Sequence, residues 1–239
     1  MSHVPLDDFL AQMAAMLAGQ QSAAQCEAAI GTSPSGTARF AVYRTLVERQ
    51  HRGVLESFFH GALVAARCWD AARCERLQLD FMQAYPPTGW APIPMVLPFA
   101  DFVESHGAPT DVIELADFAR ARHDVMSAAP SDGIEGLAVR HYSHAIGEFI
   151  NDVERDKTAT GRPRPEPTVV LLGRNRNSSS LVLVSPSLPT LVALQLVEDR
   201  VWSDELPVVD HAHVAHEAAF LYDHGLLSAA ALAVIQGCL

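Results

Sequence analysis

The sequence predicts a mainly α-helical protein with a small β-hairpin, in which an N-terminal helical bundle precedes a smaller mixed domain. Three observations lead to this prediction. Apolar residues recur at three- and four-residue spacing through the first half of the chain. Two short runs rich in β-branched residues, 169–172 and 181–184, flank a polar turn. Three further helical segments follow these runs, so the strands are a minor part of the fold.

The first half reads as a series of amphipathic helices joined by loops. Pro5 suits the first turn of the earliest helix, and Pro86 with Pro87 ends the third. Residues 19–37 are rich in Ala, Gly, Ser and Gln, and residues 86–98 hold five prolines, so we expect loops at both places. The expected helices cover residues 5–18, 38–65, 70–85, 98–106 and 110–127.

The middle of the chain allows two interpretations. Ala138, Tyr142, Ile146 and Phe149 form a helical stripe, which favours a helix over 134–154. The alternative is a strand that begins at Val139. Residues 155–167 are polar and proline-rich, as expected of a linker. We therefore expect an all-α domain over 1–130, a connecting helix and linker over 131–167, and a third region over 168–239.

The last region combines a hairpin with three helices. The polar tip, 173–180, joins the two β-rich runs, and helices are expected at 188–199, 210–224 and 228–237. Asp210 is a plausible N-cap and Gly225 a plausible C-cap of the middle helix. A hairpin supported by three helices in so short a segment is the winged-helix pattern.

The hairpin runs are apolar at successive positions, whereas a half-buried antiparallel strand alternates. Both faces of the hairpin therefore require burial. One interpretation is that the all-α half packs on the second face. The other is that a peptide or partner covers a face or adds a strand to the edge.

Charge weighs against nucleic acid as a partner. The chain has 28 acidic and 17 basic residues, a net charge of −11, and affinity for DNA rests mainly on Lys and Arg. Residues 155–176 hold six bases against two acids, a local excess of +4. This basic segment is either a solvated loop or a docking patch for an acidic peptide. A DNA-binding wing ranks third, because helix 210–224 has no Lys or Arg and carries Asp210, Glu217 and Asp223.

No residue pattern indicates catalysis or a metal site. Two weak histidine clusters, one at 211–217 and one formed by His141, His144 and Glu148, lack zinc-site spacing, and we interpret them as surface or capping residues. The cysteines form no CxxC pair, as expected of thiols in a reducing cytoplasm. Asp7 and Asp8 stand where a signal peptide carries positive charge, and no run is long enough to span a bilayer. We expect a cytoplasmic, non-catalytic binding protein without membrane contact.

The first 130 residues carry four motifs in an order that resembles the HvfC-like family, long labelled a DNA-binding domain. Two features depart from the family pattern: residues 117–120 (DFAR) replace a Leu-Glu type ending, and residues 58–60 (FFH) replace a Phe-Pro turn. These departures suggest a divergent branch. The motifs are ARFAVYR at 38–44, the spaced Leu77, Phe81 and Tyr85 before two prolines, LPFADF at 97–102, and the helix that begins near Val112.

One such branch is similar to MbnC, from methanobactin biosynthesis, and another to TglI, from 3-thiaglutamate biosynthesis. This resemblance implies a heterodimer with an iron-dependent TIM-barrel oxidase of the MbnB or TglH type. The partner would hold the iron and modify a cysteine of a ribosomally made precursor peptide, by oxazolone and thioamide formation or a related reaction. No cofactor is expected in this chain, which would be a subunit of the oxidase rather than an enzyme alone. A winged-helix transcriptional regulator is the alternative.

In that branch, the C-terminal domain resembles the element that recognises leader peptides in such pathways by strand addition. The resemblance implies a leader strand that extends the hairpin edge, with Arg174 and Arg176 meeting leader carboxylates. Helix 210–224 would close the groove. The peptide-binding residues expected on this basis are Val169, Leu171, Arg174, Arg176, Val182, Val184, His213, Glu217 and Phe220.

Overall fold

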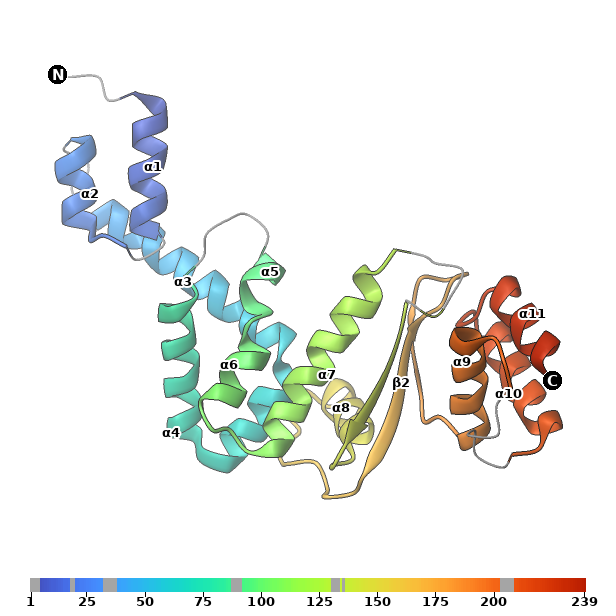
Figure 1. Cartoon of the computed structure of the whole chain (residues 1–239). Helices are drawn as coiled ribbons and strands as arrows, with labels where there is room; N and C mark the ends of the chain where they lie inside the picture. The colour runs from blue at the N-terminus through green and yellow to red at the C-terminus, as the bar shows by residue number, and fades with distance from the viewer. Residues whose placement is uncertain are drawn as a thin grey trace. The chain divides into compact units, whose positions relative to one another are not determined.

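The computed structural model describes residues 5–17, 20–31, 38–86, 92–129, 134, 136–202 and 209–239. Its mainly α-helical fold with a small antiparallel sheet confirms the predicted fold class (Figure 1). The chain divides into two compact units. The first comprises residues 1–116 and 159–162, and the second comprises residues 117–158 and 163–239. The division therefore falls inside a helix, before residue 130, and a short part of the expected linker belongs to the first unit.

The first unit is helical. A second helix lies within 19–37, where only a loop was expected, and it begins at a capping box between Ser22 and Gln25. A five-residue helix also lies within the expected loop 86–98. The helices are α1 (Leu6–Leu17), α2 (Ala23–Ile30), α3 (Ala38–Phe58), α4 (His60–Ala84), α5 (Pro92–Val96), α6 (Phe99–Ser105) and the start of α7 (Thr110–Ser127).

The helix predicted over 38–65 is interrupted at Phe59. This residue has φ −102° and ψ 30°, its side chain is fully buried, and α4 starts directly after it. A second irregularity at Asp70 kinks α4, and the Asp70 carboxylate accepts a hydrogen bond from the Arg73 backbone N–H at 2.9 Å. The breaks therefore lie at 59 and 70, and not between 65 and 70 as the pattern predicted.

Aromatic side chains form the centre of the first unit. The ring of Phe99 lies 5.0 Å from that of Phe59 and 5.1 Å from that of Phe81, and Phe102 lies 5.4 Å from Phe81. Tilted and edge-on pairs at these distances add to the stabilisation from burial. This aromatic packing joins α4 to α6 and explains why Phe59 leaves the helical path.

The second unit contains a three-stranded antiparallel sheet in the order β1-β2-β3. The helix predicted over 134–154 is wrong in its first part, because residues 137–142 form a strand that pairs with β2. A helix follows only from Ile146. The elements after α7 are β1 (Leu137–Tyr142), α8 (Ile146–Arg155), β2 (Thr168–Arg174), β3 (Leu181–Val184), α9 (Leu188–Asp199), α10 (His211–Asp223) and α11 (Ala229–Cys238).

Both faces of this sheet are covered within the second unit. Leu171 is fully buried in a core with α9, α10 and α11, and Val182 and Val184 pack against the same core. On the other face, Val170 and Leu172 are also buried. The helices α9–α11 lie on one side of the sheet and α8 with the end of α7 on the other (Figure 1). The successive apolar positions of the hairpin are thus explained by two helical layers.

Asp117 fastens the end of α7 to the sheet. Its carboxylate accepts a hydrogen bond from the Tyr142 hydroxyl at 3.0 Å and lies 3.3 Å from Arg140 Nε. The Tyr142 ring also packs edge-on against Phe118 at 6.4 Å between centroids. The DFAR segment at 117–120 therefore helps to hold the end of α7 on the sheet.

The segment between α8 and β2 is tied to the first unit at residues 159–162. The guanidinium of Arg162 makes two hydrogen bonds, at 2.6 and 2.7 Å, to the buried carboxylate of Asp111 on α7. The Gly161 backbone N–H donates to Cys68 Sγ at 3.0 Å. The expected linker is an ordered strap, because a bidentate pair to a buried carboxylate fixes its position.

None of the helices in the described ranges combines the length and apolar character that a membrane crossing requires.

Candidate functional site

The outer edge of β3 is the main candidate site. β3 pairs with β2 on one side, and in the described part of the chain no strand pairs with its other side. An edge strand presents backbone N–H and C=O groups that can pair with a further strand. The other edge strand is β1, whereas β2 lies in the centre.

The central position of β2 corrects one half of the expected site. Leu171 pairs with Val139 of β1 on one side and with Val184 of β3 on the other, so no added strand can reach it from an edge. Val169 pairs with His141 of β1, and β3 ends before it. Leu171 is also fully buried. The error follows directly from the missed strand β1, since a two-stranded hairpin would have left β2 with a free edge.

The hydrogen-bond alternation of the ladder identifies which β3 residues face outward. The Asn175 backbone N–H donates to the Ser180 carbonyl at 2.8 Å, which places this pair at a hydrogen-bonded position. Hydrogen-bonded and non-hydrogen-bonded pairs alternate along an antiparallel ladder. Val182 and Val184 then pair with β2, and the backbone groups of Leu181 and Leu183 point to the free edge.

Sequence reasoning selected Val182 and Val184 on this strand, but it missed Leu181 and Leu183. The valine side chains pack in the core below the sheet. Leu183 packs on the opposite face, where its Cδ2 would lie 3.6 Å from a Cβ placed at Gly147 of α8. The register of the hairpin, which no local sequence signal specified, decides which residues offer their backbone.

The helix α10 packs mainly on α9 and α11. One side of this helix carries His213, Glu217 and Phe220. Glu217 Oε2 accepts a hydrogen bond from the buried Thr190 hydroxyl at 2.7 Å. Thr190 and Ser187 form the capping box of α9, the helix that follows β3. Glu217 thus connects α10 to the start of α9, close in sequence to the end of β3.

The two other α10 candidates have local partners. His213 Nδ1 lies 3.5 Å from the Asp210 carboxylate, with both side chains largely exposed. The partly exposed Phe220 ring packs on His224 at 4.0 Å between centroids. Neither of these partners lies on β3.

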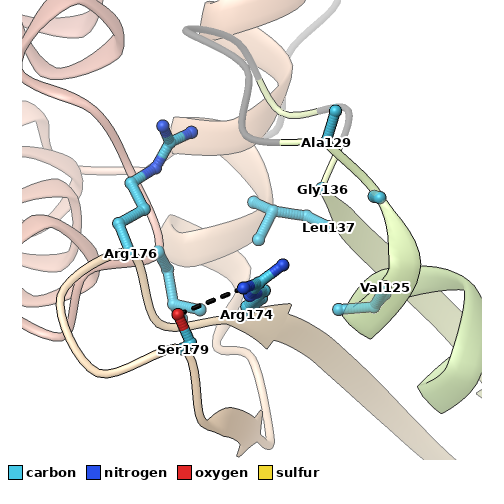
Figure 2. Close-up of a pocket in the computed structure, with 9 residues that line it drawn as sticks. Val125, Ala129, Gly136, Leu137, Arg174, Arg176 and Ser179 are labelled. Carbon is cyan, nitrogen blue, oxygen red and sulfur yellow. Dashed lines mark hydrogen bonds between the residues drawn. The ribbon is translucent and has the colours of Figure 1, made fainter.

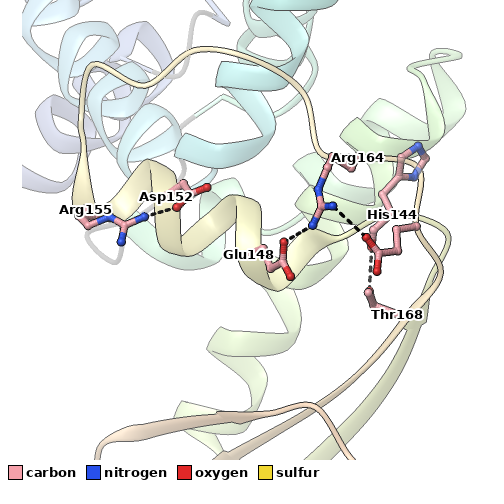
Figure 3. Close-up of polar contacts among 7 residues, drawn as sticks. His144, Glu148, Asp152, Arg155, Arg164 and Thr168 are labelled. Carbon is pink, nitrogen blue, oxygen red and sulfur yellow. Dashed lines mark hydrogen bonds and ion pairs between the residues drawn. The ribbon is translucent and has the colours of Figure 1, made fainter.

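Ion pairs engage three of the six bases in the basic segment at 155–176. Arg155 pairs with Asp152, and Arg164 pairs with Glu148 at 2.5 Å (Figure 3). Arg162 is held by Asp111, whose hydrogen bond and charge raise the pKa of the guanidinium. The pairing of these arginines with carboxylates makes a continuous docking patch for an acidic peptide a poor description of this segment.

Arg174 and Arg176 lie apart from those ion pairs, at the hairpin end of β2. Arg174 donates to the Met126 carbonyl at 3.3 Å and to Ser179 Oγ at 3.1 Å. The Arg176 backbone N–H donates to the Gly225 carbonyl at 2.9 Å. Both side chains border a small pocket.

In neither of the two histidine clusters do the side chains converge on a common point. His211 Nδ1 lies 3.1 Å from the Leu239 carbonyl, and its ring packs on Trp202 at 4.1 Å. His144 Nδ1 lies 3.0 Å from Ser143 Oγ, while Glu148 is engaged by Arg164. Among the described residues, no group of three or more His, Cys, Asp or Glu side chains is placed to hold a metal ion.

The four cysteines are free thiols. Cys26 and Cys74 are buried, Cys238 is partly exposed and Cys68 is exposed. Burial raises the pKa of the Cys74 thiol. Cys68 is therefore the thiol most accessible to solvent.

Comparison with known proteins adds no relative. No protein-family model matches the chain, and no curated protein matches it.

Proposed function

We propose that this protein is the non-catalytic partner subunit of an iron-dependent TIM-barrel oxidase in the cytoplasm. In this proposal it binds the leader of a ribosomally made precursor peptide and presents a cysteine of that peptide for modification. The observation that carries the proposal is the open outer edge of β3, in a sheet whose two faces are already covered. The resemblance of the N-terminal motifs supplies the nature of the partner.

Strand addition suits this edge because the side chains of β3 are already engaged in packing. Main-chain hydrogen bonds from Leu181 and Leu183 would supply affinity, and neighbouring side chains would set the register of the peptide. β3 has four residues, so the added strand would be short.

The elements around the edge are held in place, which lowers the entropy cost of binding. Ser187 and Thr190 cap α9 three residues after β3 ends. The Thr190–Glu217 hydrogen bond then links α9 to α10. Glu217 and its neighbours on α10 therefore act in this proposal as supports of the edge, in addition to any contact with the peptide.

The proposal assigns iron and redox chemistry to the oxidase subunit, as the resemblance implies. The role of this chain would be to raise the local concentration of the peptide at the partner's active site.

The alternative function, a winged-helix transcriptional regulator, requires a basic recognition helix. α10 and its cap carry Asp210, Glu217 and Asp223 and no Lys or Arg. Carboxylates on a reading helix repel phosphate, so the charge of this helix favours a peptide over DNA.

The test uses two substitutions at one edge position. Leu183→Pro removes an outward N–H but no hydrogen bond to β2, and proline is tolerated at such edge positions. Leu183→Ala truncates the same side chain and keeps the N–H. Binding of a cysteine-containing precursor peptide encoded beside this gene would be measured by calorimetry on the full chain.

We expect Leu183→Pro to weaken peptide binding about tenfold more than Leu183→Ala, since the backbone hydrogen bond that this N–H donates to the peptide is lost. Equal affinities for the two variants, with both folded, would rule out strand addition at this edge. Co-purification with the neighbouring oxidase tests the partner separately. A low-salt gel shift that showed a DNA complex would favour the regulator alternative.

A further inference from the structure

A small pocket opens at the hairpin end of the second unit. It has a volume of about 110 Å³. Val125 near the end of α7, Ala129 just after that helix and Leu137 at the start of β1 lie around it (Figure 2). Ala128 and Leu226 also line the pocket. Arg174, Arg176 and Ser179 complete its polar side. The pocket lies entirely within one unit of the chain.

Among the described residues, the guanidinium of Arg174 has only neutral partners. Its Nη1 donates to the Met126 carbonyl and its Nη2 to Ser179 Oγ. This differs from Arg155, Arg162 and Arg164, each of which is paired with a carboxylate. Because a guanidinium carries five N–H donors, the two neutral contacts leave part of the donor set of Arg174 for a ligand.

The surrounding backbone holds this arginine in place. Ser179 has φ 56°, a conformation that is uncommon for residues other than glycine, and its hydroxyl lies beside the guanidinium (Figure 2). The contact with the Met126 carbonyl fixes the other side at the end of α7. An arginine positioned in advance loses less side-chain entropy when it binds an anion.

The charge and lining of the pocket define the ligand. The nine described residues that line it include two arginines and no acidic residue. Half-buried Arg174 faces apolar walls from Val125, Leu137 and Leu226. Planar carboxylates match the guanidinium fork, while the walls suit a short branched hydrocarbon and would strip water from a phosphate without replacing it.

We propose that this pocket binds a carboxylate that carries a short apolar group, with Arg174 as its anchor. The group could be supplied by a free small carboxylic acid or by the C-terminus of a peptide that ends in an aliphatic residue. This site is separate from the β3 edge, and it stands whether or not a leader strand binds there.

The test measures binding of four probes to the full chain by heteronuclear NMR. We expect saturable binding of 3-methylbutanoate and of N-acetyl-leucine, with shifts at Leu137 and Ser179. The alcohol 3-methylbutanol and inorganic phosphate should bind at least about tenfold more weakly, because each lacks one half of the recognition. The carboxylate that binds more tightly identifies the source of the ligand: 3-methylbutanoate represents a free acid, and N-acetyl-leucine represents the C-terminus of a peptide.

Substitutions distinguish binding by the Arg174 guanidinium from a general effect of positive charge. Arg174→Gln should abolish binding of both carboxylates, and Arg174→Lys should weaken it, since lysine keeps the charge without the fork. Ala128→Leu fills the pocket and should also abolish binding, with Arg174 intact. Arg155→Gln, which changes an arginine outside the pocket, should have no effect.

Three outcomes would overturn the proposal: no saturable binding of either carboxylate, phosphate binding as tightly as the carboxylates, or unchanged binding in folded Ala128→Leu.

Discussion

Gly173 in β2 is a position where a single methyl group tests the packing of the sheet on the C-terminal helices. A Cβ at this residue would lie 2.3 Å from Leu226 Cδ2 and 2.7 Å from Leu137 Cδ2. Carbon atoms at optimal contact are about 3.5–4.0 Å apart. Gly173→Ala therefore forces both leucines to move.

The cost depends on how freely the leucines can shift. Leu137 is half-buried, but Leu226 is 1% exposed within the core. Overpacking of a well-filled core costs about 1–3 kcal/mol, and the reduced entropy of the unfolded chain returns about 0.4–1 kcal/mol. We expect a net loss of about 1–2 kcal/mol in the free energy of unfolding, which lowers the Tm of the second unit by about 2–8 °C.

Chemical and thermal unfolding of the full chain measure this loss. Gly53→Ala is the matched control, because a Cβ there meets nothing within 4 Å in helix α3, and it should stabilise by up to about 1 kcal/mol. Adding Leu226→Ala to Gly173→Ala should cost less than the sum of the two single variants. A Gly173→Ala protein as stable as the wild type would refute the described packing of β2.

Three further predictions concern other parts of the chain. Asp111→Asn breaks the bidentate pair with Arg162 and should lower the free energy of unfolding by about 1–3 kcal/mol. Burial lowers the pKa of His51, so its contribution to stability is present above pH 6.5 and lost as the pH falls below that value. His51→Leu should therefore gain stability relative to wild type by up to about 1.4 kcal/mol per pH unit in that range. Under native conditions Cys68 should react rapidly with a thiol reagent, and buried Cys74 only on unfolding.

Each of these has a contradicting result. Unfolding curves that coincide for Asp111→Asn and wild type would show that the strap at 159–162 adds nothing to stability. A wild-type to His51→Leu difference that stays constant from pH 7.5 to 5.5 would show that His51 is not buried uncharged. Alkylation of Cys74 as fast as that of Cys68, followed by mass spectrometry of tryptic peptides, would contradict the described burial.

Local patterns in the sequence predicted most helices and the hairpin. The predicted run 181–184 coincides with β3, and Asp210 caps α10 as expected through a hydrogen bond to the Ala212 N–H. These features depend on residues within a few positions of one another. α2 was missed because it is short, although its Ser22–Gln25 capping box was present in the sequence.

Long-range pairing explains the errors. Residues 138, 142, 146 and 149 have helical spacing, but pairing with β2 makes 137–142 a strand, because tertiary contacts override a local pattern. The sequence could not show that bases of the segment 155–176 are paired, because a partner can lie far away along the chain. Arg162 binds Asp111, which is 51 residues away. The candidate site inherited the first of these errors, since the pairing of β1 with β2 decides which edge of the sheet is open.

The outer edge of β3 is the proposed binding site for a peptide backbone. Amide hydrogen exchange at single residues tests it most directly, because the N–H groups of Leu181 and Leu183 would pass from solvent into a β-ladder. The precursor peptide should slow exchange at these two amides, while Val182 and Val184, already paired with β2, should change little. Unchanged exchange at Leu181 and Leu183 in the saturated complex would show that the peptide does not add a strand at this edge.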